Sequence, residues 1–154
     1  MNKEIIIREA LKDDLPSLLS LYKHLHVDDE PLPSQTELDK TWIDIIGNSC
    51  IHCIVGEKEG TLVSSCILVI VPNLTHGARP YGLIENVVTH SDFRRQGYAN
   101  AVLQRAIEIA RSYKCYKVML LSSRKRDKAH SLYEKVGFER ESKYGFVAKI
   151  EQDL

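Results

Sequence analysis

The chain has 154 residues, 44% hydrophobic and 27% charged, and its 21 basic residues balance its 21 acidic ones. This length suits a single globular domain over residues 1–154, and zero net charge gives no overall attraction to nucleic acid or to an anionic membrane. The three isoleucines near the N-terminus are too few for a leader or a membrane span, so we expect a cytoplasmic protein without a membrane partner.

The first third of the chain predicts one strand and two helices. A run of isoleucines predicts a strand over residues 4–9. Leucines at helical spacing predict a helix over residues 15–25. Ser34 and Glu37 have the spacing of a capping box, which predicts a second helix that ends near Gly47.

The middle of the chain predicts three strands. Residues 50–56 and 61–71 are rich in β-branched and apolar side chains, and the short polar stretch between them predicts a hairpin turn. Proline and glycine at both ends of residues 72–82 predict a surface loop before a strand over residues 83–89.

The last third predicts helices and strands in alternation. An apolar stripe over residues 99–113 predicts the longest helix, and residues 117–121 form a short continuous apolar run typical of a covered strand. A further helix is expected over 129–136, and closing strands over 138–141 and 144–150. This order predicts an α/β or α+β fold with a central mixed β-sheet flanked by helices.

The four cysteines indicate packing rather than redox or metal chemistry. They lie in apolar runs at positions 50, 53, 66 and 115, and a core of this size needs no disulfides. Cys50, His52 and Cys53 resemble half of a zinc site, but no second ligand pair follows at a suitable spacing. We therefore expect reduced thiols and no metal.

The stretch RRQGYAN, residues 94–100, follows a predicted strand and opens the longest predicted helix. The first N–H groups of a helix have no partner within it, and Arg94, Arg95 and the helix dipole all favour an anion there. Gly97 and Ala99 keep bulk away from these amides, which suits a pyrophosphate. An ordinary basic helix start is the alternative, and the stretch matches neither nucleotide-binding glycine motif.

This stretch resembles the R/Q-x-x-G-x-G/A loop of the GNAT superfamily of N-acetyltransferases. The resemblance continues through residues 84–110 and through SLYEKVGF at 131–138, which is similar to the tyrosine-bearing helix of that superfamily. It implies a GNAT fold and an enzyme that moves an acetyl group from acetyl-CoA directly to an amine.

The resemblance also implies a set of cofactor-binding residues. The backbone of the central strand would pair with the pantetheine arm, and the following loop would hold the diphosphate. By position these residues are Val87, Val88, Thr89, Arg94, Arg95, Gln96, Gly97, Tyr98, Ala99 and Asn100. The superfamily often has Asn seven residues before the tyrosine, whereas this chain has Arg126, which we expect to contact phosphate.

Acetyl transfer to an amine requires a base and benefits from an acid. An amine with a pKa of about 10.4 lies roughly 4.6 kcal/mol from its neutral form at pH 7. Glu85 is the only carboxylate between Glu59 and Asp92, and the resemblance implies that it deprotonates the acceptor. Tyr133 would protonate the departing thiolate, although its position on an apolar helical stripe also suits a core residue.

The sequence does not identify the amine that accepts the acetyl group. In the superfamily the first two helices wall the acceptor site, which points to Tyr22, His24, His26 and the acidic run at 28–30. A small-molecule or peptide amine is expected, and the acidic run suits a cationic one. The alternative function is a non-catalytic module that only binds acyl-CoA. The oligomeric state is also open, and Trp42 or the C-terminal strand could lie at the interface of a homodimer.

Overall fold

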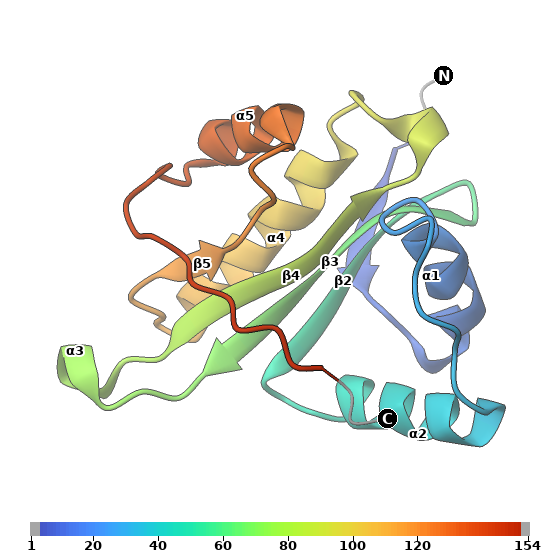
Figure 1. Ribbon diagram of the computed structural model, residues 1–154, viewed down its shortest axis with the longest axis horizontal. Helices are drawn as coiled ribbons and strands as arrows, with labels where there is room; N and C mark the ends of the chain where they lie inside the picture. Colours follow the sequence, from blue (N-terminus) through green and yellow to red (C-terminus); the bar gives the residue numbers. More distant parts are fainter. Residues whose placement is uncertain (1–3, 152–154) are drawn as a thin grey trace. The chain divides into compact units, whose positions relative to one another are not determined.

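A computed structural model describes residues 4–151, which divide into two compact units after Leu120. The first unit holds the sheet and most helices (Figure 1). Its strands are β1 (Ile6–Glu9), β2 (Ile51–Lys58), β3 (Thr61–Val71), β4 (Tyr81–Thr89) and β5 (Val118–Leu120). Its helices are η1 (Lys12–Asp14), α1 (Leu15–Tyr22), α2 (Gln35–Ile46), α3 (Thr75–Ala78), η2 (Ser91–Phe93) and α4 (Tyr98–Ser112). The second unit contains α5 (Asp127–Val136).

The sheet has five strands in the order β1-β2-β3-β4-β5. The first four are antiparallel neighbours, whereas β4 and β5 run parallel and are joined through α4. A parallel pair needs a long crossover connection, which the helix supplies. The predicted mixed sheet with flanking helices is therefore confirmed.

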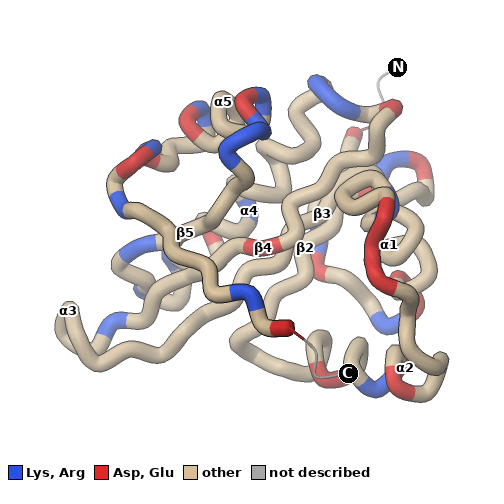
Figure 2. Tube along the Cα trace, viewed as in Figure 1, with Lys and Arg blue, Asp and Glu red and all other residues tan. Residues whose placement is uncertain are grey.

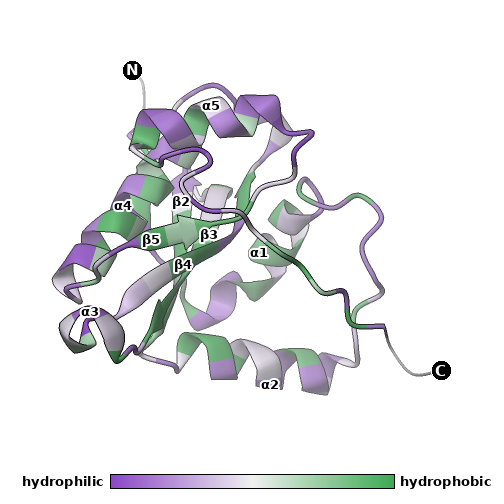
Figure 3. Cartoon of the chain, turned by 60° about the vertical axis from the view of Figure 1, so that its left-hand side comes forward, coloured by the Kyte–Doolittle hydropathy of each residue, from purple (hydrophilic) through white to green (hydrophobic). Residues whose placement is uncertain are grey.

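Helices cover both faces of the sheet within the first unit. On one face, leucines of α1 and Trp42 of α2 pack with Cys53, Val55 and Val88 of the strands. On the other face lies α4, where the Cys66 thiol of β3 points to the Val102 carbonyl oxygen at 3.6 Å. Figure 3 shows hydrophobic and hydrophilic residues in alternation around α4, as expected of a helix with one face on a core.

Local sequence signals explain where several elements begin and turn. The Ser34 side chain accepts a hydrogen bond from the Glu37 backbone N–H at 3.3 Å, and the Glu37 carboxylate accepts one from the Ser34 N–H at 3.2 Å. This reciprocal pair is the predicted capping box. The β2–β3 hairpin turns at Glu59 and Gly60, which both have positive φ, as a two-residue hairpin loop requires.

Two of the expected boundaries differ from those of the structure. The first helix ends at Tyr22 rather than at residue 25, because His24 and Leu25 donate tighter i→i−3 hydrogen bonds to Leu21 and Tyr22. The expected loop at 72–82 contains the short α3, and its end already belongs to β4.

The closing strands expected over 138–141 and 144–150 are not formed. Their residues have the composition of strands, but β-propensity produces a strand only where a neighbouring strand completes the hydrogen-bonded ladder. No such pairing occurs for these residues within 4–151. Tyr144 and Phe146 are instead exposed.

Trp42 was the other feature expected at an interface, and it belongs to the core instead. Only 4% of its surface is exposed, and its indole N–H donates to the Lys12 carbonyl oxygen at 2.9 Å. Its burial and its satisfied donor leave nothing for a partner chain to contact. Among the described helices, none has the length and apolar character to cross a membrane.

Candidate active site

A bulge interrupts the central strand β4 beside the candidate base. Ser65 of β3 lies opposite Val88, and Ile67 lies opposite Glu85, so one residue of β3 faces two of β4. Asn86 occupies the extra position with φ 52°. Asn tolerates this left-handed conformation better than most residues because its short side chain bonds locally.

The same region of β4 has a free edge toward β5. The parallel pairing of β4 with β5 ends at Ile84 opposite Leu120. Residues 85–89 therefore have no strand partner on that side among the described residues of the first unit. An unpaired strand edge offers N–H and C=O groups to an extended ligand. This edge includes the main chain of Val87, Val88 and Thr89.

Glu85 is exposed and lies at the bulge. Because residues directly opposite in a sheet point to the same face, its side chain shares a face with Ile67. Ile67 packs against the cluster under α1 and α2. The carboxylate is thus on the α1/α2 side of the sheet, next to the left-handed Asn86.

The predicted diphosphate turn has an unusual backbone. Arg95 and Gly97 both have positive φ, 60° and 85°, and α4 begins at the next residue. Gly97 makes no side-chain cap, and the first intrahelical bond runs from the Ala101 N–H to the Gly97 carbonyl oxygen at 3.0 Å. A Cβ built on Gly97 would meet no atom within 4 Å. The space beside the Gly97 Cα is therefore open, and the first N–H groups of α4 directly after it have no partner within the helix, as an anion site requires.

Side chains of β2 and of the turn itself contact one another beside this turn. The Lys58 ammonium at the end of β2 lies 5.8 Å from the Phe93 ring centroid and 5.6 Å from that of Tyr98. The Tyr98 hydroxyl donates to the Gln96 amide oxygen at 3.3 Å. Proximity to the Tyr98 hydroxyl raises the pKa of Lys58. These contacts stabilise the positions of the Phe93 and Tyr98 side chains on either side of the turn.

Arg94 is directed to main-chain oxygens. Its guanidinium donates to the Thr89 carbonyl at 3.2 Å and to the His24 carbonyl, in the turn after α1, at 3.1 Å. The His24 and His90 rings pack together, with centroids 4.0 Å apart. Segments about 70 residues apart in sequence therefore meet at the entrance to the diphosphate turn.

Tyr22, the last residue of α1, places a buried hydroxyl under the bulge. This hydroxyl has no hydrogen-bond partner of suitable geometry within residues 4–151. Burial raises the pKa of Tyr22, with a smaller contribution from Cys53, while the Asn86 side chain acts in the opposite direction. The buried hydroxyl thus lies near the Asn86 side chain but makes no hydrogen bond of good geometry with it.

The second unit carries the other candidates. Tyr133 lies on α5, is 9% exposed, and meets the Phe138 ring edge-on with centroids 6.1 Å apart. Arg126 is the residue before the first turn of α5. The His130 ring nitrogen Nε2 lies 2.8 Å from the Ser123 carbonyl oxygen, which orders the loop before the helix.

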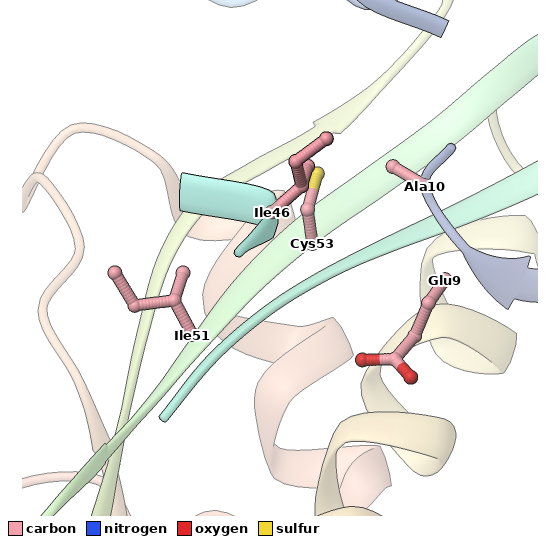
Figure 4. A pocket seen from close by; sticks show the side chains of 5 residues that line it. All are labelled: Glu9, Ala10, Ile46, Ile51 and Cys53. Atoms are coloured by element: carbon pink, nitrogen blue, oxygen red, sulfur yellow. The ribbon is translucent and has the colours of Figure 1, made fainter. Parts of the chain in front are cut away.

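A small cavity lies at the ends of β1 and α2, beside the start of β2 (Figure 4). Its volume is about 180 Å³, and it is lined by Glu9, Ala10, Ile46, Ile51 and Cys53. The Glu9 carboxylate points away from the Cys53 thiol in Figure 4 and lies 2.5 Å from Nδ1 of His52. The cavity is smaller than ordinary ligand sites of about 300–1,000 Å³.

The cysteines are free thiols, and no cluster of three or more potential metal ligands occurs within the described residues. Cys53 and Cys66 are buried, as expected for packing residues, whereas Cys50 and Cys115 are half-buried. Burial raises the pKa of Cys53 to about 11, so this thiol is a poor nucleophile.

Two residues of this region were not singled out from the sequence. Asn86 forms the bulge with a positive φ. An Asn inside a β-rich run is a sequence signal for such a left-handed residue, so this position could have been predicted. His90 caps η2 by accepting the Asp92 N–H at 3.1 Å and packs against His24. The capping role of His90 could be read from the neighbouring residues, but its contact with His24 could not, because the two residues are far apart in the sequence.

Known proteins agree with this architecture. The model of the Acetyltransferase (GNAT) family matches residues 15–138. A glucosamine 6-phosphate N-acetyltransferase of Trypanosoma brucei brucei is 42% identical over 82 residues, which are 53% of this chain and 54% of that relative. The matched part thus spans about half the length of the relative.

Two solved structures are similar over nearly the whole chain. One is a protein of Agrobacterium tumefaciens str. C58 assigned as an acetyltransferase, with 41% identity, a TM-score of 0.87, and coverage of 96% of this chain and 99% of that one. The other is an acetyltransferase of Trypanosoma brucei, with 33% identity, a TM-score of 0.77, and coverage of 98% and 100%. The chain belongs to the GNAT family of acetyltransferases.

Proposed function

We propose that this GNAT acetyltransferase moves the acetyl group of acetyl-CoA directly to the amine of a small molecule. The observation that carries the proposal is the free edge of β4 at residues 85–89, which leads into the open N–H groups at the start of α4. An extended ligand that ends in a diphosphate matches this sequence of groups: main-chain pairing along the strand, then an anion site.

In this proposal the pantetheine arm pairs with the main chain of Val87, Val88 and Thr89. The diphosphate lies on the turn of residues 95–100, and Arg95 and Arg126 supply positive charge. Gly97 is required because its φ of 85° is strained for other residues and because the diphosphate must come close to the backbone of this turn.

The transfer step assigns one role to each candidate catalytic residue. The amine nitrogen attacks the thioester carbonyl carbon, a C–N bond forms, and the C–S bond breaks. Glu85 takes the proton that the amine loses, directly or through water. Tyr133 gives a proton to the departing thiolate. The exposed carboxylate beside the bulge of β4 supports the role of Glu85.

Glucosamine 6-phosphate is the first acceptor to test, because a relative that matches half of the chain carries that activity in its name. A cationic amine is the second, because the loop between α1 and α2 carries Asp28, Asp29 and Glu30 (Figure 2). The two classes make opposite demands: a phosphate group needs cations in the acceptor site, whereas a polyamine needs carboxylates.

The test measures thiol release from acetyl-CoA with glucosamine 6-phosphate, glucosamine, spermidine and an aminoglycoside. We expect turnover with at least one of them. Glu85→Gln should lower kcat by about 100-fold or more and remove the acidic limb of the pH profile, while CoA affinity by calorimetry stays within about twofold. Glu108→Gln, which changes an exposed carboxylate on α4 that pairs with Arg105 at 3.2 Å, is the control and should leave kcat unchanged. Binding of CoA without turnover of any amine favours the non-catalytic binding module instead.

A further inference from the structure

The turn that follows α1 is tied to the segment that leads into the diphosphate turn. Three contacts join them: the Arg94 guanidinium donates to the His24 carbonyl oxygen at 3.1 Å, the Ser91 N–H donates to His24 Nδ1 at 3.3 Å, and the His24 and His90 rings pack at 4.0 Å. All of these residues belong to the first compact unit. We call His24, His90 and Arg94 the latch.

Arg94 directs two of its five N–H donors to carbonyl groups of the protein inside this arrangement. Its Nε–H donates to the Thr89 carbonyl oxygen at 3.2 Å while its Nη2–H reaches His24. A guanidinium that binds a diphosphate presents its planar donor fork to the phosphate oxygens. Here Nε and one Nη group of the fork are already directed at two carbonyl groups of the protein.

Both imidazoles must be neutral for the latch to hold. His24 Nδ1 accepts the Ser91 N–H, and His90 Nδ1 accepts the Asp92 N–H at 3.1 Å. A ring nitrogen that accepts a hydrogen bond carries no proton, so each ring has its proton on Nε2. Protonation of Nδ1 removes the acceptor and places a cation beside another imidazole and a guanidinium.

The charges around His24 oppose its protonation. Burial, His90 and Arg94, in that order, lower the pKa of His24 below its ordinary value of 6.5, and Asp92 acts in the opposite direction. His24 Nδ1 therefore stays available above pH 6.5, and the Ser91 bond is lost only as the pH falls through the lowered pKa of His24.

We propose that His24, His90 and Arg94 are positioning residues that couple the acceptor-side loop, residues 23–34, to the diphosphate turn. Binding of CoA at the turn then orders the loop, and the loop in turn supports CoA binding, because coupling between two sites is reciprocal. This proposal rests on the proposed function of the turn, and it reassigns Arg94 from phosphate contact to the support of that turn.

The first experiment separates phosphate contact from positioning. CoA affinity of the full chain is measured by calorimetry over a range of salt concentrations for wild type, Arg94→Met and Arg95→Met. Loss of a phosphate contact lowers the slope of log Kd against log salt, because one fewer ion pair is formed. We expect Arg95→Met to lower the slope, and Arg94→Met to weaken binding about tenfold with the slope unchanged. An equal loss of slope in Arg94→Met overturns the reassignment.

The second experiment asks whether the hydrogen bond or the ring of His24 matters. An Asn Oδ1 can take the place of His Nδ1 as acceptor but does not titrate at this pH, whereas Phe keeps a ring without an acceptor. We expect His24→Asn to bind CoA like wild type at pH 7.5, and His24→Phe to bind about as weakly as Arg94→Met.

As the pH is lowered in steps from 7.5 through the lowered pKa of His24, wild type should lose more CoA affinity than His24→Asn. The titration of CoA's own phosphates is common to both proteins and cancels in this comparison. Equal losses overturn the pH dependence of the latch.

The third experiment needs no acceptor. Hydrogen exchange of the amides of residues 23–34 is followed with and without saturating CoA. Wild type should show slower exchange with CoA, and the slowing should be lost in Arg94→Met and in His24→Phe but kept in His24→Asn. If wild type binds CoA without such slowing, the coupling is wrong although the diphosphate turn is right. If wild type binds no CoA, the proposed function itself fails.

Discussion

Replacement of Gly97 by alanine separates the conformational demand of the diphosphate turn from its role as a binding site. Gly97 has φ 85°, and a Cβ there meets no atom within 4 Å, so the folded protein has room for the methyl group but not for the conformation. The left-handed region costs an L-residue about 1–2 kcal/mol. For a domain of this size, 1 kcal/mol corresponds to roughly 2–4 °C in Tm.

Gly60, in the β2–β3 hairpin, supplies the matched control. Its φ is 82°, and a Cβ there also meets no atom within 4 Å. Gly60→Ala therefore carries the same strain without contact to the diphosphate turn. We expect the two variants to lose similar amounts of thermal stability, as measured by calorimetric melting of the free protein.

Of the two variants, only Gly97→Ala should weaken the binding of CoA. In the proposed site the strained alanine would disturb the approach of the diphosphate to the helix N–H groups, and loss of one hydrogen bond to a charged group costs about 1.5–3 kcal/mol, which is at least a tenfold rise in Kd. Titration calorimetry with CoA measures this directly. If Gly97→Ala binds CoA as tightly as Gly60→Ala does, the diphosphate does not lie on this turn, and the reasoning from the helix N-terminus is refuted.

Three further changes test the fold and the site. Arg8 lowers the pKa of Asp14 below its ordinary 3.8 through a hydrogen bond, and it also bonds the Glu57 carboxylate, so these contacts stabilise the fold above pH 4. Arg8→Met should cost about 2 kcal/mol in urea unfolding at pH 7, and this cost should shrink as the pH falls through the lowered pKa of Asp14. A cost that does not change with pH contradicts this assignment. Ser34→Ala removes the cap that pairs with Glu37 and should cost about 1 kcal/mol, whereas Ser34→Asp should cost little. Tyr22→Phe removes a buried hydroxyl without a partner, so the melting temperature should stay equal or rise; a fall of several degrees would show that the hydroxyl is bonded.

The sequence by itself determined the features that depend on neighbours along the chain. The capping box at Ser34, the turn at Gly60 and the helix that follows Gly97 all follow from spacing, glycine and apolar periodicity. These signals act over a few residues, so they hold whatever the rest of the chain does. The mixed sheet followed from the order of the elements.

The tertiary structure decided which groups face one another across long separations. The position of Arg94 against a carbonyl group 70 residues away, the burial of Trp42 and the bulge at Asn86 depend on how the strands pair and how α1 and α2 pack. The segment 144–150 has the composition of a strand, yet it forms none here. A strand exists only with a partner, and a side chain's role is set by the groups within hydrogen-bond reach, which local sequence does not specify.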